Sequence, residues 1–286
     1  AGIFSAILLV GGVVSILMHQ GLNYGIDFRG GTNIQIRFKE VPNLDQLRNF
    51  FSEQNLGNVM LQTFGAVEDR EILLGLSVDN PLGTGEKLTA GLREMLQPNY
   101  PEMEIRRIET IGPKVGDELK TSALQAILIA LGLVLIYITF RFQWRQGIAA
   151  IITLLHDVMV VVGIFSIFDK EFTLPVIAAL LTVVGYSLND TIVIFDRIRE
   201  NISKFRKREL LPLINQSVTE TLSRTLLTSG TTLMVVLALV FLGGEIIHDF
   251  AFALLVGVLI GTYSSIYVAS PTVLWLTKIA PPKSSD

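Results

Sequence analysis

A carboxylate and a guanidinium lie inside apolar stretches of this chain. Asp190 lies in the run Leu174 to Phe195, and Arg224 lies in the run Thr221 to Leu242. Placing a charged group at the centre of a membrane helix costs about 2.5 to 3.5 kcal/mol even on insertion scales. A nearby arginine favours the charged form of a carboxyl group and burial disfavours it, whereas arginine itself stays protonated. The two residues therefore predict a proton site at Asp190, with Arg224 controlling when that carboxyl binds a proton.

Hydroxyl groups follow Arg224 along its own helix. Thr228 and Thr231 come four and seven residues later, so the three side chains share one helical face. That face suits a hydrated proton path or an approach to Asp190. The alternative is a fixed ion pair between Asp190 and Arg224 that only holds two helices together.

A second intramembrane acid is Asp157, which follows His156 in the apolar run Ile148 to Phe168. Asp157 either extends the proton path or hydrogen-bonds to another helix, and the sequence leaves both interpretations open. Asn189 adds an amide directly before Asp190, and we include it in the expected path. Proton and sodium both remain candidates for the coupled ion, because a carboxylate beside hydroxyl groups suits either.

Membrane helices must position these groups, as the composition also indicates. Half of the 286 residues are apolar and only 17% are charged, which is typical of a chain whose solvent is the bilayer. A helix of about 20 apolar residues crosses the hydrocarbon core. We expect crossings at Ile3 to His19, Ser122 to Phe140, Ile148 to Phe168, Leu174 to Phe195, Thr221 to Leu242 and Phe250 to Ile279. In the last of these, small residues recur every four positions and predict close helix packing: Gly257, Gly261 and Ser265.

Lysine and arginine predict which side of the membrane each connection faces. The connections after the second and fourth runs are basic and should be cytoplasmic, and both termini then lie inside. Their basic residues include Arg141, Arg145, Arg197, Arg199, Lys204 and the cluster Arg206, Lys207 and Arg208. Topology accounts for this cluster, with acidic membrane lipid as the alternative contact. The first run begins near Ala1 without a basic flank, and we interpret it as a truncated membrane helix rather than a signal peptide.

The segment from residue 21 to residue 118 should be an exported soluble domain, because it separates the first two crossings. Its pattern predicts strands at Asn33 to Phe38, Met60 to Phe64, Ile72 to Val78 and Met103 to Glu109. Two amphipathic helices alternate with them, one capped by Asn43 and one running from the turn Gly83 to Gly85 to about Leu96. This β-α-β-β-α-β order predicts a ferredoxin-like domain.

Several function classes are excluded by what the sequence lacks. With no cysteine, there is no disulfide, thiolate nucleophile or cysteine metal site. The sequence contains no phosphate-binding glycine loop, no metal-spaced histidine pair and no nucleophile with its base. A net charge of -3 gives no nucleic-acid signature. We therefore expect no enzyme activity, no cofactor and no nucleic-acid partner.

Several longer motifs resemble the SecD/SecF family, and some resemble its SecF branch in particular. They are Asn23 to Thr32, Gly112 to Gly116, Gly185 to Thr191 continuing into Asp196 to Asn201, Arg224 to Thr232, and Ser264 to Ala269. The motifs occur in the right order over nearly the whole chain. Together they are far more specific than any one of them.

The resemblance implies a protein of the resistance-nodulation-division superfamily in the bacterial cytoplasmic (inner) membrane. It implies an all-α bundle of six transmembrane helices, with the α+β domain inserted between helices 1 and 2 on the periplasmic side. The expected divisions are residues 1–20, 21–118, 119–280 and a cytoplasmic tail at 281–286. The family's residues for proton flow match Asp190 and Arg224.

The partners that the resemblance implies are SecD, or the SecD half of a fused chain, and the SecYEG channel. YajC is a further candidate partner. Proton motive force would help to move a preprotein across the membrane. The alternatives are half of a proton-driven small-molecule exporter, and a structural subunit of the translocation complex that conducts no ions.

Overall fold

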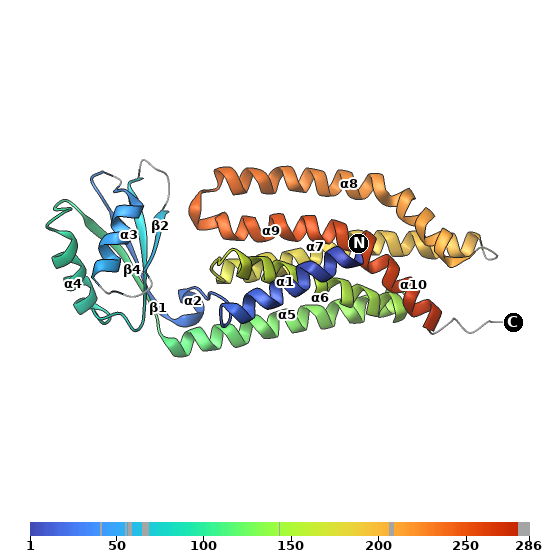
Figure 1. Ribbon diagram of the computed structural model, residues 1–286, viewed down its shortest axis with the longest axis horizontal. Helices are drawn as coiled ribbons and strands as arrows, with labels where there is room; N and C mark the ends of the chain where they lie inside the picture. Colours follow the sequence, from blue (N-terminus) through green and yellow to red (C-terminus); the bar gives the residue numbers. More distant parts are fainter. Residues whose placement is uncertain are drawn as a thin grey trace.

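The chain folds into a bundle of long helices with a small sheet domain at one end (Figure 1). The computed structural model describes residues 1–279 except 41, 55, 57, 58, 65–68, 143 and 206–208. The basic cluster Arg206 to Arg208 and the tail at 281–286 therefore lie outside the described residues.

Five helical segments of the described chain are long and apolar enough to cross a membrane. They are α5 (Pro113–Arg141), α6 (Trp144–Ile167), α7 (Leu174–Lys204), α8 (Leu210–Leu242) and the segment Ile247–Ile279, which comprises most of α9 (Gly244–Ser264), the π-helical turn η2 (Ser265–Ala269) and α10 (Ser270–Ile279). The helix α1 (Gly2–Met18) is apolar but shorter, at 17 residues. The chain is thus a multi-pass membrane protein.

Two of these helices begin more than two turns earlier than the apolar runs indicate. α5 begins at Pro113 rather than Ser122, and α8 begins at Leu210 rather than Thr221. Proline is favourable in the first turn of a helix, because the missing N–H has no intrahelical partner there. The polar turns before each apolar run are therefore helical extensions beyond the membrane core.

The sheet domain follows α2 (Ile26–Arg29) and contains four antiparallel strands in the order β2-β3-β1-β4. Its elements are β1 (Gly31–Arg37), α3 (Leu44–Glu53), β2 (Val59–Phe64), β3 (Glu71–Ser77), α4 (Glu86–Leu96) and β4 (Glu104–Ile111). Asn43 caps α3, because its side chain accepts hydrogen bonds from the Asp45 and Gln46 amides. The four predicted strands and two helices of this segment are confirmed.

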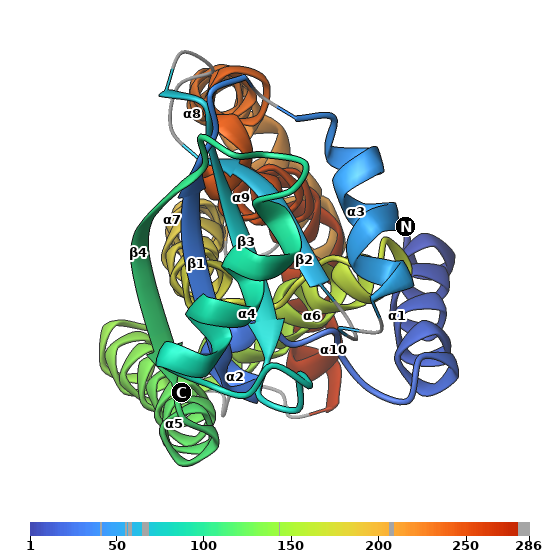
Figure 2. The same ribbon diagram turned by 90° about the vertical axis from the view of Figure 1, so that its left-hand side faces the viewer.

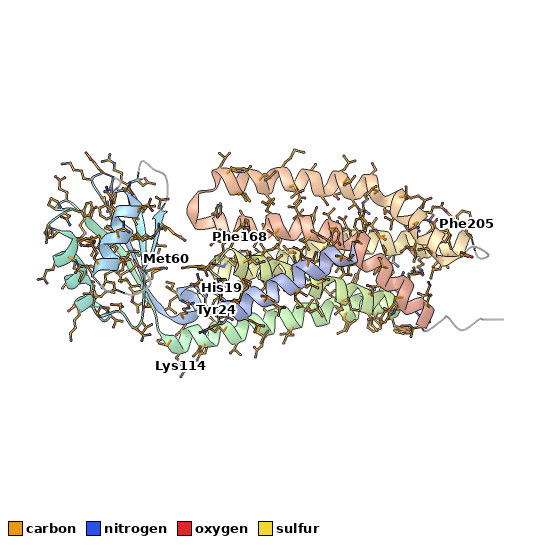
Figure 3. All side chains as sticks on the ribbon, in the orientation of Figure 1. His19, Tyr24, Met60, Lys114, Phe168 and Phe205 are labelled. Atoms are coloured by element: carbon orange, nitrogen blue, oxygen red, sulfur yellow. The ribbon has the colours of Figure 1, made fainter. Side chains whose placement is uncertain are left out.

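Both helices of the domain cover one face of the sheet, and the membrane helices lie behind the other face (Figure 2). Side chains alternate along a strand, so Leu61 of β2 and Leu74 of β3 are buried against α3 and α4. Met60 and Gln62 then project from the opposite face. β2 also contacts α9, and Met60 lies on the side of the domain that faces the bundle (Figure 3).

Glycines bring the membrane helices close together at two places. A Cβ atom on Gly12 of α1 would lie 2.7 Å from the Gly163 Cα atom of α6. On α9, a Cβ atom on Gly257 would collide with Val183, and one on Gly261 would lie 3.0 Å from Ser187 Cβ. The predicted packing role of this small-residue stripe is confirmed.

Candidate functional site

Asp157 lies at the centre of a buried hydrogen-bond network that joins three helices. Its Oδ2 atom accepts hydrogen bonds from Ser187 of α7 at 2.6 Å and from Ser264 of α9 at 2.7 Å. Its Oδ1 atom lies 2.9 Å from Nδ1 of the neighbouring His156. Asp157 is only 1% exposed. Close packing at Gly261 brings the serines of α7 and α9 within reach of α6.

Asp190 occupies a second buried position on α7, with an exposure of 3%. Ser229 of α8 donates a hydrogen bond to Asp190 Oδ2 at 3.4 Å. Thr262 of α9 in turn donates to the Ser229 hydroxyl at 2.8 Å. Three helices therefore meet at this carboxyl through neutral hydroxyl groups.

The two carboxyl networks are adjacent because α7 contributes to both. Ser187 and Asp190 are three residues apart and so share a helical face. At a rise of 1.5 Å per residue, Asp190 lies about 24 Å along α7 from Leu174. Asp157 lies about 15 Å from the α6 end at Ile167. Both acids are therefore at membrane depth, with Asp190 farther from the sheet domain.

Arg224 lies on an exposed position of α8. No ion pair joins it to Asp190 in the structure. The ion pairs of α7 involve its far end instead, where Asp196 contacts Arg141 at 3.1 Å and Arg197 contacts Glu220. In this conformation, α7 and α8 are therefore not held together by a fixed ion pair between Asp190 and Arg224.

The other predicted path residues that the structure describes make no hydrogen bond to Asp190. Thr228 and Thr231 donate to carbonyl groups of their own helix, at Arg224 and Leu227. Asn189 is on the exposed side of α7. A different hydroxyl series on α8, spaced at four residues, is buried: Thr221, Thr225 and Ser229. Its member Ser229 contacts Asp190 of α7.

Sequence reasoning missed the hydroxyl partners of both acids, although signals for them were present. Ser187 precedes Asp190 by three residues, and Ser264 begins one of the recognised motifs. The four-residue spacing from Thr221 to Ser229 also indicates a common face. Helix periodicity alone does not specify which face of α8 packs against α7, because that depends on tertiary contacts.

Several buried polar atoms near these acids have no hydrogen-bond partner among the described residues. They are His156 Nε2, Tyr186 Oη and Thr191 Oγ1. Buried polar atoms are normally paired with protein or water. Together with the serine and threonine hydroxyls, these atoms form a cluster of polar groups between the helices. Within the described part of the chain, no group of three or more acidic or histidine side chains could hold a metal ion.

Fold and site together define a multi-pass membrane protein with an inserted antiparallel sheet domain and two buried carboxyls at membrane depth. The model of the C-terminal region of the protein export membrane proteins SecD and SecF matches residues 92–279. The model of the SecD/SecF GG motif matches residues 15–40. The chain belongs to the SecD/SecF family.

Individual relatives agree with this assignment. The chain is 49% identical over 271 residues to protein translocase subunit SecF of Desulfurispirillum indicum, covering 93% of this chain and 85% of that relative. It is 46% identical over 277 residues to the SecF subunit of Vibrio alginolyticus, covering 96% and 87%.

Solved structures of SecDF are also similar to the whole chain. The crystal structure of SecDF from Thermus thermophilus, a translocon-associated membrane protein, is 39% identical with a TM-score of 0.81. The comparison covers 96% of this chain but only 37% of the SecDF chain. SecDF in a super-membrane-facing form gives a TM-score of 0.71 at 40% identity, covering 96% of this chain and 38% of that one.

Proposed function

We propose that this chain works as the SecF-type subunit of the accessory complex of the Sec protein translocase. In this proposal it uses proton motive force together with SecD to promote preprotein translocation across the bacterial inner membrane. The relatives' names support the role in protein translocation. The role of the proton is argued below from the intramembrane residues.

The observation that carries the proton mechanism is that no ion pair joins Arg224 to the buried Asp190 in this conformation. Asp190 is buried among neutral hydroxyl groups, whereas Arg224 lies on an exposed helical face. Burial disfavours the charged form of a carboxyl group, whereas hydrogen bonds from hydroxyl groups and the approach of a guanidinium favour it. A conformational change that moved Arg224 toward Asp190 would therefore release a proton. Its withdrawal would let a proton bind again.

The available energy is sufficient for such a cycle. One elementary charge that crosses about 150 mV releases roughly 3.5 kcal/mol. A tenfold change in an equilibrium constant corresponds to about 1.4 kcal/mol. One proton can therefore shift a two-state conformational equilibrium by more than two orders of magnitude.

The Asp157 network extends the proposed path toward the sheet domain. Ser187 connects the two levels, since it donates to Asp157 and lies one turn from Asp190. The proposed path opens when α7 and α8 move relative to each other. We assign three further residues to the part that opens: Asn189, Thr228 and Thr231.

The exposed surface of the bundle and the similarity to SecDF support SecD as a partner. In the most apolar window of α5 only 6% of residues are buried, and in that of α8 only 17%. Arg224 is exposed on α8, where contact with hydrocarbon alone would be unfavourable. Six helices of SecD packed against this surface would bury it. The greater length of the matched SecDF chain supports this arrangement, because it leaves room for a SecD half.

The proposed architecture has six crossings, with α1 as the first, and divisions at residues 1–20, 21–118, 119–280 and 281–286. The inserted domain is ferredoxin-like, which its strand order supports. It lies on the periplasmic side, because the far end of the bundle contains the basic residues Arg141 and Arg197. The SecYEG channel would supply the emerging preprotein, and YajC is a further candidate partner. No enzyme activity is proposed for the chain.

Export driven by proton motive force tests this function. Vesicles containing the chain with SecD and SecYEG are supplied with a preprotein, and protected product is measured with and without a proton gradient. We expect Asp190→Asn to remove the gradient-dependent part of export while the complex still assembles. The matched control is Asp196→Asn on the same helix, which removes an exposed ion pair. Equal gradient dependence in Asp190→Asn and the parent chain would identify a structural subunit instead.

A further inference from the structure

The segment that connects α1 to the sheet domain is hydrogen-bonded to the connection between α6 and α7. We call residues 23–29 the linker and residues 168–173 the outer loop. The Phe172 amide donates to the Asn23 carbonyl at 2.7 Å, and the Gly25 amide donates to the Phe172 carbonyl at 3.0 Å. The Asn23 side chain donates to the Asp169 carbonyl at 3.2 Å. These bonds dock the linker on the outer ends of the membrane helices.

A further bond fixes the linker to α7 itself. The Leu174 amide, in the first turn of α7, donates to Asp27 Oδ2 at 2.9 Å. A carboxylate is favourable at this position because the first N–H groups of a helix lack intrahelical partners. Tyr24 lies at the end of the bundle that faces the sheet domain (Figure 3). Movement of the linker relative to α7 would thus move the domain relative to the proton path.

Glu171 lies inside this docked junction. Its Oε2 atom is buried and has no hydrogen-bond partner among the described residues. The same atom is next to the linker, since a Cβ atom on Gly25 would lie 3.5 Å from it. Glu171 also lines a cleft of about 790 Å³ between the outer helix ends and the sheet face that contains Met60.

The charged groups around Glu171 come from α2, the outer loop and α9, and Arg48 of α3 also lines the cleft. α2 supplies Asp27 and Arg29, the outer loop supplies Asp169 and Lys170, and α9 supplies His248 and Asp249. Lys170 is already paired with Asp249 at 2.6 Å. Burial raises the pKa of Glu171, and the negative charge of Asp249 raises it further, although Arg29 lowers it. Asp27 and Asp169 add further increases to the pKa of Glu171.

The direction of this shift determines how docking depends on pH. A carboxyl whose pKa is raised in one state binds a proton more tightly in that state than in water. Proton binding therefore stabilises the docked linker, and the stabilisation is lost as the pH rises through the pKa of docked Glu171. Undocking would hydrate the carboxyl and release its proton.

We propose that Glu171 is a second proton-binding site of this chain, located at the outer ends of the helices, and that its protonation holds the linker docked. The inference rests on the proposed function in one respect, because it makes Glu171 the outer end of the path through Asp157 and Asp190. In this position a proton arriving from the outer side is bound as the sheet domain docks. It is released again as the domain moves away.

Spin-label distances measure docking directly. The chain contains no cysteine, so Glu94→Cys on α4 and Phe241→Cys on α8 add the only thiols in this chain. The complex with a cysteine-free SecD half is placed in lipid nanodiscs and measured from about pH 5 to about pH 8. We expect a single narrow distance distribution at acid pH. A second, broader distance population should have at least twofold greater weight at pH 8 than at pH 5.

Variants distinguish the role of Glu171 from a general effect of pH. Glu171→Gln should remain docked at every pH, because its side chain is neutral. Asp249→Asn should shift the transition to lower pH, since it removes a negative charge that favours protonation. Glu118→Gln, an exposed position at the start of α5, should behave like the parent chain. Gly25→Ala should weaken docking at all pH values, because its methyl group would lie 2.8 Å from Thr173 Cγ2.

An unchanged pH response in Glu171→Gln would overturn the proposal, as would a parent chain whose distances do not vary with pH. The measurement uses neither a proton gradient nor a preprotein. Its result is therefore independent of whether Asp190 conducts protons. Failure of the proposed function would appear in the export experiment while leaving the docking result intact.

Discussion

The Ser187 hydroxyl donates a hydrogen bond to Asp157 Oδ2 at 2.6 Å, and Ser187 itself lies one helical turn from Asp190. This contact joins α6 to α7 at membrane depth. Ser264 of α9 bonds to the same oxygen atom. Because two serines hold one carboxyl oxygen, the positions of three helices and of two acidic residues depend on each other.

Removal of one of these hydroxyls should destabilise the bundle. We expect Ser187→Ala to lower the free energy of unfolding in detergent by about 1 to 2 kcal/mol, because a buried acceptor loses an interhelical hydrogen bond. Ser264→Ala should have a similar effect, and the double variant should lose less than the sum. Ser203→Ala, exposed on α7, is the control. Full additivity in the double variant would show that the two bonds are independent.

The contact between α1 and α6 predicts that substitutions of two neighbouring glycines change the free energy of unfolding by different amounts. Gly12→Ala should cost about 1 to 3 kcal/mol, since the added methyl group would lie 2.7 Å from Gly163 Cα. Gly11→Ala should be neutral or slightly stabilising, because nothing lies within 4 Å of its Cβ position. Thermal unfolding in detergent compares the two. Equal losses in both variants would contradict the observed packing of α1.

Arg224 should affect function without stabilising the isolated chain. It makes no ion pair with Asp190, so Arg224→Leu should change the free energy of unfolding of the chain alone by less than about 0.5 kcal/mol. With SecD present, the same variant should lose gradient-driven export, and Arg224→Lys should restore only part of it. A large loss of stability in the isolated chain would instead favour the fixed ion pair.

The cap of α3 allows an independent test of the sheet domain. Asn43→Ala should destabilise this domain by about 1 kcal/mol, because the Asp45 and Gln46 amides lose their side-chain acceptor. Ser52→Ala at the exposed end of the same helix is the matched control. Hydrogen exchange of α3 in the full chain reports the difference. Equal protection in both variants would show that the cap contributes no stability.

The secondary structure of this chain is largely predictable because local patterns specify it. Alternation along β1 and β3, the Asn43 cap and the long apolar runs all correspond to observed elements. The start of α5 was also readable, since Gly112 and Pro113 form a standard helix beginning. The length of the apolar run does not indicate this start, because the first turns of that helix are polar.

The candidate site was predictable only in part, because its geometry depends on contacts between distant segments. The burial of Asp157 and Asp190 follows from their apolar surroundings in the sequence. The bond between Asp27 and Leu174 spans 147 positions, and no local pattern encodes it. The face of α8 that meets α7 is likewise set by packing, so Arg224 lies on the exposed side and Ser229 on the buried side.

Proton uptake by inverted vesicles containing the chain with SecD tests the central claim, that Asp190 is a working proton site. Parent, Asp190→Asn and Asp196→Asn complexes are compared at equal assembly. The proposed mechanism predicts at least a tenfold loss of proton flow in Asp190→Asn and parent-like flow in Asp196→Asn. Undiminished flow in Asp190→Asn would contradict it and place the proton site elsewhere.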